Sequence, residues 1–401
     1  MLSSLRHRPF AFLWAGQAIS RLGDALYQIA LAWWLVEKTG SATIMATVLI
    51  FSNIPMLIFI LIGGVAADRF PRVQVMLASD VLRLAVVGVV AALTYTNTLQ
   101  VWHIFVASAI FGTVGAFFLP AYTAIIPEIT PLEIRNSANA LTSISYKFSF
   151  VIGPALGAIV YSLTGASAAF ALDAASFLVA ALCVLPLLGL RQPAPAEPAR
   201  PNVLAEVRDG VATVAGIPWL WVTIILFGFL NMTFNGPLRA SIPFLIKDNL
   251  HGTVGLLAEF TTAQALGNIL GAALIGRLRR FGHRGLIGYG SQAVCGLLLA
   301  LMGLGIPALA VIADSFVLGI FFAFFDLIWT ATLQELVPPE KLGRVSSVDA
   351  LGSFVLLPVG YGLTGILTDR LGAPAVLAGG GLLSVLCIGV ALLHPAVRRV
   401  D

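Results

Sequence analysis

The sequence predicts an all-α integral membrane protein, from its composition and from the lengths of its apolar stretches. Hydrophobic residues make up 59% of the chain, charged residues only 10%, and the mean hydropathy is +0.96. A soluble domain carries about 25% charged residues. Apolar stretches of about 20 residues, long enough to cross a hydrocarbon core as a helix, recur along the chain. The short alternating segments typical of a membrane β-barrel do not occur.

Twelve of these stretches qualify as transmembrane spans. Each is predicted to be a helix, because an open strand leaves backbone groups without hydrogen bonds in lipid. The spans run from 10 to 36, 42 to 67, 74 to 95, 99 to 126, 137 to 163, 166 to 190, 217 to 246, 253 to 276, 285 to 305, 307 to 334, 345 to 368 and 374 to 394.

Basic residues are distributed unevenly between the loops on the two sides of these spans. If the amino terminus is cytoplasmic, only Lys38, Arg239, Lys247 and Arg370 fall on the outer side. Lys and Arg accumulate in cytoplasmic loops, so both termini are predicted to be cytoplasmic. This topology accounts for the net charge of +4 and the pI near 9.1. No basic run with interleaved aromatic residues indicates a nucleic-acid partner.

A polar, proline-rich stretch, "RQPAPAEPARPNVLAEVRDG" at 191 to 210, separates six spans from six. Such a composition is typical of a linker. The predicted domains are an N-terminal six-helix half over 1–190, a cytoplasmic linker over 191–216 and a C-terminal six-helix half over 217–401.

The two halves share an internal repeat. "AFFLPAYTAIIPEITP" at 116–131 matches "AFFDLIWTATLQELVP" at 323–338, with seven identities in 16 residues at an offset of 207. An offset of 212 aligns Arg72 with Arg284. Two parallel repeats with a site near the middle of the membrane are the layout of secondary transporters, which work by alternating access. A membrane-embedded enzyme has no comparable reason to be duplicated.

The loop after the second span, "GGVAADRFPR", resembles the cytoplasmic signature of the major facilitator superfamily in Gly64, Asp68, Arg69 and Arg72. The resemblance implies the major facilitator fold. It also implies a gating role, in which Gly64 allows close helix packing and the charged residues latch the two halves at the cytoplasmic mouth. The stretch departs from the family pattern at Pro71.

Other motifs point to one branch of that superfamily. "GPALGA" in span 5 resembles the antiporter signature, in which Pro154 bends the helix and Gly153 and Gly157 form a packing seam. "LWAGQAISRLGDALYQIAL", "FFLPAYTAIIPEITPLEIRNSANAL" and "FALDAASFL" resemble the drug-proton antiporter branch that contains macrolide efflux pumps and enterobactin exporters. A lysophospholipid flippase has a similar first span.

Arg21 and Asp24 lie near the middle of the first span. A charge at that depth costs at least about 2.5 to 3.5 kcal/mol and usually faces a bundle interior or a water-filled path. Spaced three residues apart, the two share one helix face. They are interpreted either as a structural ion pair or as a coupling site in which Asp24 carries a proton.

Other candidates are sorted by the helix that bears them, because the resemblance places spans 1, 4, 7 and 10 around a central cavity and spans 3, 6, 9 and 12 outside it. Asp173 in span 6 and the pair Asp80 and Arg83 in span 3 are interpreted as structural. The further candidates for coupling or cargo contact are Asp326 in span 10, Lys147 in span 5, Glu259 in span 8, and Asn231 and Asn235 in span 7, where the asparagines could equally join helices.

The predicted function is proton-coupled export of a small amphiphilic or drug-like molecule from a bacterial cell, across its inner or cytoplasmic membrane. A lipid flippase, an uncoupled facilitator and a non-transporting sensor or scaffold are the alternatives. Acids on lining helices argue against the scaffold, which would gain by replacing them with Leu. The expected partners are membrane lipid, cargo and protons, and the protein is expected to be a monomer with no cofactor, metal or catalytic residue. Cys183, Cys295 and Cys387 lie in apolar spans and are expected to be free thiols.

Overall fold

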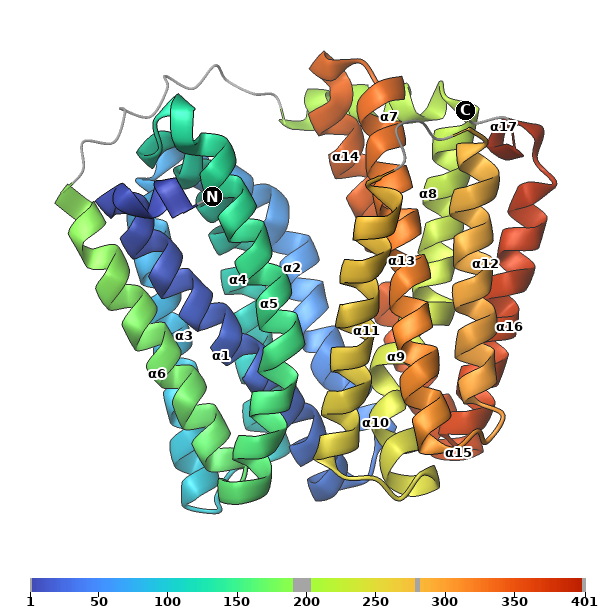
Figure 1. Ribbon diagram of the computed structural model, residues 1–401, viewed down its shortest axis with the longest axis horizontal. Helices are drawn as coiled ribbons and strands as arrows, with labels where there is room; N and C mark the ends of the chain where they lie inside the picture. The colour runs from blue at the N-terminus through green and yellow to red at the C-terminus, as the bar shows by residue number, and fades with distance from the viewer. Residues whose placement is uncertain (1, 190–202, 278–281, 399–401) are drawn as a thin grey trace. The chain divides into compact units, whose positions relative to one another are not determined.

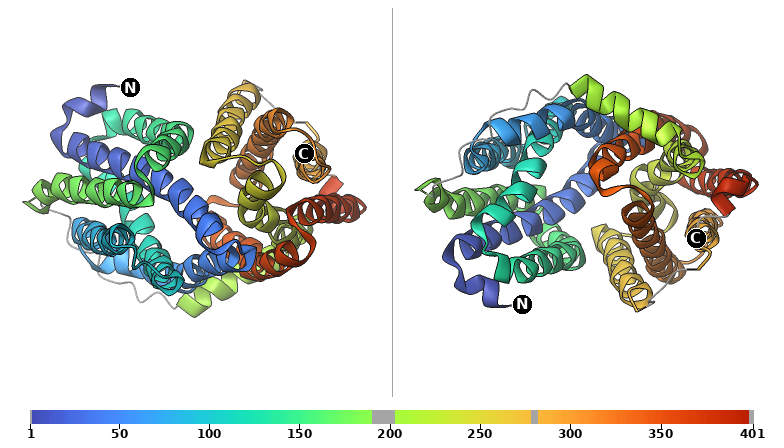
Figure 2. Two further views of the ribbon diagram at one scale, coloured as in Figure 1. Left: turned by 90° about the horizontal axis from the view of Figure 1, so that it is seen from below. Right: turned by 90° about the horizontal axis from the view of Figure 1, so that it is seen from above.

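The structure is a computed structural model that describes residues 2–189, 203–277 and 282–398. Within these ranges every regular element is a helix. Contacts divide the chain into unit 1, residues 1–39 and 47–199, and unit 2, residues 40–46 and 200–401. Each unit is a bundle of helices, as Figures 1 and 2 show from three directions.

Ten helical segments are long and apolar enough to cross a membrane, among the residues described. They coincide with ten of the predicted spans. The other two predicted spans fall on helix α1 and helix α11, which are 32 and 22 residues long. At 1.5 Å per residue, both also reach the thickness of a hydrocarbon core. Twelve crossings and the cytoplasmic position of the termini stay predictions.

Unit 1 is built from six long helices. Their bounds are Arg8–Thr39 (α1), Ala42–Arg69 (α2), Arg72–Tyr95 (α3), Val101–Ile129 (α4), Leu132–Thr164 (α5) and Ala166–Val184 (α6), with short 3-10 helices at Leu2–Arg6 (η1) and Leu185–Gly189 (η2). Gly165, at φ +81°, makes the tight turn between α5 and α6, a conformation that only glycine adopts without strain. Near the amino-terminal end of the unit, Phe10, Met76 and Ile125 form part of a buried core joining α1, α3 and α4. α6 packs against both α1 and α3, and this packing positions the site described below.

Unit 2 contains the remaining helices, and its apolar segments Pro218–Asn249 and Pro339–Leu371 each consist of more than one helix. The bounds are Val203–Ala215 (α7), Pro218–Leu230 (α8), Gly236–Ala240 (α9), Ile242–Phe244 (α10), Val254–Ile275 (α11), Arg284–Met302 (α12), Ala308–Leu336 (α13), Pro339–Phe354 (α14), Leu357–Leu371 (α15), Ala373–Leu392 (α16) and Pro395–Arg398 (α17). π-helical turns at Asn231–Asn235 (η3) and Leu245–Asn249 (η4) fall inside the segment Pro218–Asn249. Such turns mark local departures from regular α-helix and are frequent at functional sites.

The predicted linker contains a helix. Within 191–216, residues 191–202 lie outside the described residues, while α7 packs against α14 in unit 2. Arg344 and Lys341 of α14 hold α7 through an ion pair of 2.7 Å to Asp209 and a hydrogen bond of 3.2 Å to Thr213. Unit 2 also includes the first turn of α2, where Asp369 accepts hydrogen bonds from Ser41 Oγ and from the backbone amides at 42 and 43.

Glycines bring pairs of helices into backbone contact at repeat-related positions. A Cβ on Gly112 of α4 would lie 1.9 Å from the Ser52 carbonyl oxygen of α2, and one on Gly319 of α13 would lie 2.1 Å from the Gln264 carbonyl oxygen of α11. Gly112 and Gly319 differ by the repeat offset of 207. Small residues that let backbones approach are the usual means of helix packing in membranes.

We expect Gly112→Ala to destabilise the protein by about 1–3 kcal/mol, because the added methyl group forces α2 and α4 apart. Gly88→Ala in α3 is the matched control, since nothing described lies within 4 Å of a Cβ there. That control should be neutral or stabilising by up to about 1 kcal/mol, because Ala favours a helix over Gly. The measurement is the midpoint of thermal unfolding of the purified protein in detergent. Equal midpoints for the two variants would contradict this account of the α2–α4 contact.

Candidate functional site

Five charged side chains from three helices gather inside unit 1, and we call them the charge cluster. Asp80 and Asp173 have no exposed surface, and Arg83 is 9% exposed. Asp24 lies half-buried in the middle of α1. The five members are Arg21 and Asp24 of α1, Asp80 and Arg83 of α3, and Asp173 of α6. Of these five residues, Arg21 and Asp24 were predicted to form a site, and the other three were interpreted as structural.

The members of the charge cluster act on one another electrostatically. Arg83 attracts the Asp24 carboxylate more strongly than Arg21 does. Arg83 also attracts Asp80 and Asp173, whereas Asp24 repels both of these carboxylates. Charges in a low-dielectric interior interact over longer distances than in water. The five side chains therefore form one electrostatic unit.

Arg83 is held among aromatic rings. Its guanidinium carbon lies 4.6 Å from the ring centre of Phe118 and 5.7 Å from that of Phe177. Both distances are within the range of a cation–π contact, which is stronger when the cation is removed from water. These rings take the place of part of the guanidinium's hydration, so a positive charge is kept between α3, α4 and α6.

Arg21 is also held by rings and is not an ion-pair partner of Asp24. Its guanidinium carbon lies 4.8 Å from the ring centre of Tyr122 and 5.1 Å from that of Tyr146. No ion pair within 4.0 Å joins Arg21 to Asp24 in the part of the chain that the structure describes. The interpretation of these two residues as a direct structural pair therefore has no support in the geometry.

Asp80 and Asp173 each have a partial set of hydrogen bonds. The Gln17 amide of α1 donates to Asp80 Oδ2 at 3.1 Å. The Ser176 hydroxyl lies 3.3 Å from Asp173 Oδ1 and donates to the Asp173 carbonyl oxygen at 2.7 Å. Asp173 also touches α1, since a Cβ on Gly23 would lie 2.6 Å from Asp173 Oδ1. Gly23 thus lets the Asp173 carboxyl group approach the backbone beside Asp24.

Three buried polar atoms of the charge cluster have no hydrogen-bond partner among the described residues. They are Asp80 Oδ1, Arg83 Nε and Asp173 Oδ2. Buried polar atoms in structural networks are nearly always paired. The unused donor and acceptors give this cluster a capacity to bind protons or polar groups that a closed structural network lacks.

The glycines of span 5 fix the position of α1 beside this cluster. A Cβ on Gly153 would lie 2.4 Å from Ala25 Cβ, and one on Gly157 would lie 3.0 Å from the Leu26 carbonyl oxygen. Pro154 lies between them inside α5, which is continuous from Leu132 to Thr164. The seam therefore packs α5 directly against the turn of α1 that carries Asp24.

The other predicted candidates do not join the charge cluster. Asn231 is buried and donates to the Ser353 carbonyl oxygen at 2.7 Å, and it accepts a hydrogen bond of 2.6 Å from Asn235, so these amides join η3 to α14. Asp326 and Glu259 are exposed on α13 and α11 of unit 2, and Lys147 is half-buried on α5 of unit 1.

Sequence reasoning missed Asp314 of α13. This residue is 5% exposed, and neither carboxyl oxygen has a hydrogen-bond partner within the described ranges. The available signal was a charge inside the predicted span 307–334.

In the described part of the chain, no group of three or more His, Cys, Asp or Glu side chains could hold a metal ion.

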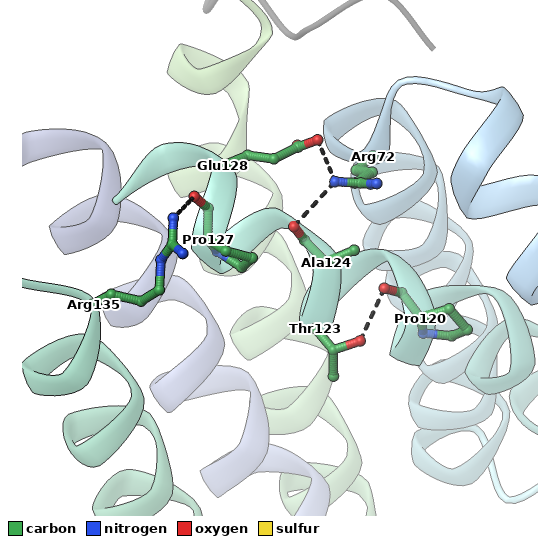
Figure 3. Close-up of polar contacts among 7 residues, drawn as sticks. All are labelled: Arg72, Pro120, Thr123, Ala124, Pro127, Glu128 and Arg135. Atoms are coloured by element: carbon green, nitrogen blue, oxygen red, sulfur yellow. Dashed lines mark hydrogen bonds and ion pairs between the residues drawn. The ribbon is translucent and has the colours of Figure 1, made fainter. Parts of the chain in front are cut away.

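The predicted gating residues lie at the end of unit 1 that carries the amino terminus. Arg72, at the start of α3, bonds the Glu128 carboxylate and the Ala124 carbonyl oxygen of α4 (Figure 3). Arg135 donates to the Pro127 carbonyl oxygen at 2.9 Å in the same view. Arg284 and Glu335, the repeat equivalents of Arg72 and Glu128, form the corresponding ion pair in unit 2.

Two of the gating expectations need qualification. The Asp68 side chain lies outside the described residues, and Arg69 is exposed. No described atom lies within 4 Å of a Cβ on Gly64, whereas one on Gly63 would lie 2.0 Å from the Ala116 carbonyl oxygen. Near the end of α2, its close approach to α4 therefore occurs at Gly63, one residue before the predicted position.

The comparison with protein families identifies the fold. The family model described as Major Facilitator Superfamily matches residues 13–355 and 224–400. The chain belongs to the Major Facilitator Superfamily. A crystal structure of a POT family transporter in complex with a thioalcohol-conjugated peptide shares this fold, with a TM-score of 0.76, 14% sequence identity and coverage of 98% of this chain and 97% of that one.

Within the Major Facilitator Superfamily, the chain is similar to efflux proteins, as its motifs predicted. It is 28% identical to "Macrolide efflux protein A" of Streptococcus pyogenes over 98% of this chain and 97% of that protein. It is 26% identical to "Enterobactin exporter EntS" of Shigella boydii serotype 4 (strain Sb227), over 98% and 93% of the two chains. The chain is therefore a multi-pass membrane transporter with exporters among its relatives.

Proposed function

We propose that this transporter exports a small amphiphilic or drug-like molecule in exchange for protons, by alternating access, across the cytoplasmic membrane of a bacterial cell. Membership of the Major Facilitator Superfamily and similarity to proteins named as exporters support the class of function. The proton coupling, the direction and the cargo are the content of the proposal.

The single observation that supports proton coupling is the charge cluster of unit 1. A buried charge in a membrane protein is expensive and usually serves a substrate path, an ion path or a proton relay. Here three carboxyl groups and two guanidinium groups lie together on α1, α3 and α6, each of which is long enough to cross a hydrocarbon core. Asp24 is the half-buried carboxyl group among them, which makes it the best placed to exchange a proton with water.

The aromatic setting of the two arginines supports the same role. Arg21 and Arg83 are held by rings rather than by direct ion pairs with the carboxylates. Their positive charges stay in place whichever carboxyl group is protonated. The carboxyl groups can therefore gain and lose a proton without dismantling the packing of unit 1.

The test is a flux assay in proteoliposomes that contain the purified full-length protein. A panel of cargo is offered with and without a pH gradient across the membrane, at zero electrical potential. We expect cargo to move against its concentration gradient only when protons flow the opposite way. Cargo movement that is equally fast with and without the gradient would show an uncoupled facilitator or a lipid flippase instead.

We expect Asp326→Asn to lower the apparent affinity for cationic cargo while leaving that for neutral cargo within a few fold. Asp326 is an exposed carboxylate on a membrane-crossing helix, and such a group attracts cations most strongly where water is scarce. The measurement is the concentration dependence of transport for a matched cationic and neutral pair. Glu335→Gln at the end of the same helix, where Glu335 is bonded to Arg284, is the control. Equal effects on both cargo types would exclude charge recognition by Asp326.

A further inference from the structure

The charge cluster contains one more acid than base. Its three aspartates come from three different helices, and its two arginines come from α1 and α3. With every group ionised, the cluster would carry a net charge of −1. The charged groups that act on Asp173 are Asp24 of α1 and Arg83 of α3, so these interactions supply no further cation.

A net charge is costly in such a setting, where Asp80 and Asp173 have no exposed surface. An unpaired ionised carboxylate in an apolar interior is so costly that the group takes up a proton instead. One of the three carboxyl groups is therefore expected to be neutral when the protein is at rest. The contacts of Asp24, Asp80 and Asp173 differ, and they indicate which carboxyl groups can hold the proton.

Asp80 is the carboxylate with the best support for its charge. It accepts a hydrogen bond from Gln17, and it lies three residues before Arg83 on the same face of α3. Asp173, which is equally buried, differs from Asp80 in its electrostatic partners: the repulsion by Asp24 outweighs the attraction by Arg83 at Asp173, whereas the attraction by Arg83 outweighs the repulsion by Asp24 at Asp80. Arg21 is then the remaining cation of the cluster, and it attracts Asp24, so Asp24 and Asp173 have one positive charge between them.

We propose that Asp24 and Asp173 share one proton, so that the charge cluster is neutral at rest with two guanidinium cations, two carboxylates and one carboxylic acid. The contact of Asp173 with α1 at Gly23, one residue before Asp24, carries the inference. Asp173 then belongs to the proton site and is not a structural residue. The proposal deepens the proposed function, and it rests on that function only for the use of the proton in transport.

Loss of the shared proton leaves the charge cluster with a net charge of −1. The proton leaves as H⁺ and no bond other than its O–H bond changes. A positively charged group on a cargo molecule, or a returning proton, restores neutrality. The chemistry therefore favours cationic cargo as the species that exchanges with the proton.

The experiment is infrared spectroscopy of the reconstituted protein, because the carbonyl stretch of a protonated carboxylic acid is separate from the bands of a carboxylate. Spectra of Asp24→Asn, Asp173→Asn and the double variant are subtracted from that of the wild type. We expect each single variant to lose the same acid band, and the double variant to lose no more than either one. Glu37→Gln is the control, since Glu37 lies at the end of α1 and is bonded by Trp33 and Tyr161 outside the cluster.

The outcomes are distinct. If the two single variants lose different bands, if their losses add in the double variant, or if neither loses a band, the shared proton is wrong. Asp24→Glu, which retains a carboxyl group, should keep the band and guards against an effect of misfolding. If the band behaves as expected but a pH gradient drives no cargo, the proposed function fails and the shared proton stands.

Discussion

Replacing Asp24 by Asn is expected to abolish cargo accumulation driven by a pH gradient while preserving exchange of cargo between compartments of equal pH. Asn is close in shape to a protonated Asp and cannot release a proton. In the variant, Asp80 and Asp173 balance Arg21 and Arg83 in the charge cluster, which no longer has a proton to give up. The variant can still carry cargo in either direction, but cargo movement no longer requires proton movement.

The expected size of the effect follows from the coupling. If one proton exchanges for one cargo molecule at zero electrical potential, each pH unit supports about a tenfold cargo gradient, because each corresponds to about 1.4 kcal/mol. The wild type should approach this ratio in proteoliposomes, and Asp24→Asn should give a ratio of about one at any pH gradient. Glu37→Gln, on the same helix but outside the charge cluster, should retain the wild-type ratio.

Two measurements separate loss of coupling from loss of function. Exchange of labelled cargo at equal pH shows whether the variant still transports, and its thermal midpoint shows whether it is folded. A variant that still accumulates cargo in response to the gradient would exclude Asp24 as the proton carrier. A folded variant that neither accumulates cargo in response to the gradient nor exchanges it at equal pH would show that Asp24 serves cargo binding or the conformational change instead.

The positions of the helices were predictable because hydrocarbon thickness sets the length of a membrane span. The internal repeat was equally accessible, since identities at a constant offset do not depend on packing. In the structure, equivalent residues of the two repeats form equivalent ion pairs, Arg72–Glu128 and Arg284–Glu335. Each ties the start of one helix to the end of the next within its own unit.

The partners of Asp24 were not predictable in the same way. A soluble helix shows which side faces the core through its apolar stripe, but a helix that is apolar all round gives no such direction. Asp173 lies in α6, where nearly every neighbour in sequence is apolar, so its rotation toward α1 could not be inferred. The contact depends on Gly23 and on the packing of α6 against α1.

Interruptions of regular helix were also missed. The span 217–246 was predicted as a single helix, but the corresponding segment Pro218–Asn249 contains two π-helical turns. The first of them carries Asn231, at the repeat position of Asp24. Its amide bonds the Ser353 carbonyl oxygen of α14, a contact with a helix more than a hundred residues away. Local sequence preferences carry no information about such a partner.

Arg83→Gln is expected to destabilise the protein by about 3–5 kcal/mol, the typical loss when one partner of a buried charge network is removed. The guanidinium group attracts all three aspartates of the charge cluster. Without it, the buried Asp80 loses its cation on the same helix face. The aromatic rings of Phe118 and Phe177 also lose their contact with the cation.

The double variant Asp80→Asn/Arg83→Gln decides whether charge is the cause. It removes one charge of each sign, so it should recover most of the stability lost in Arg83→Gln, as measured by thermal unfolding in detergent. Arg21→Gln is the matched control, because Arg21 is half-buried and keeps more access to water, and its loss should cost less. If the double variant is no more stable than Arg83→Gln, then Arg83 stabilises unit 1 through packing against the rings. The charge cluster would in that case not be a balanced set, and both the neutral resting state and the proton shared by Asp24 and Asp173 would lose their physical basis.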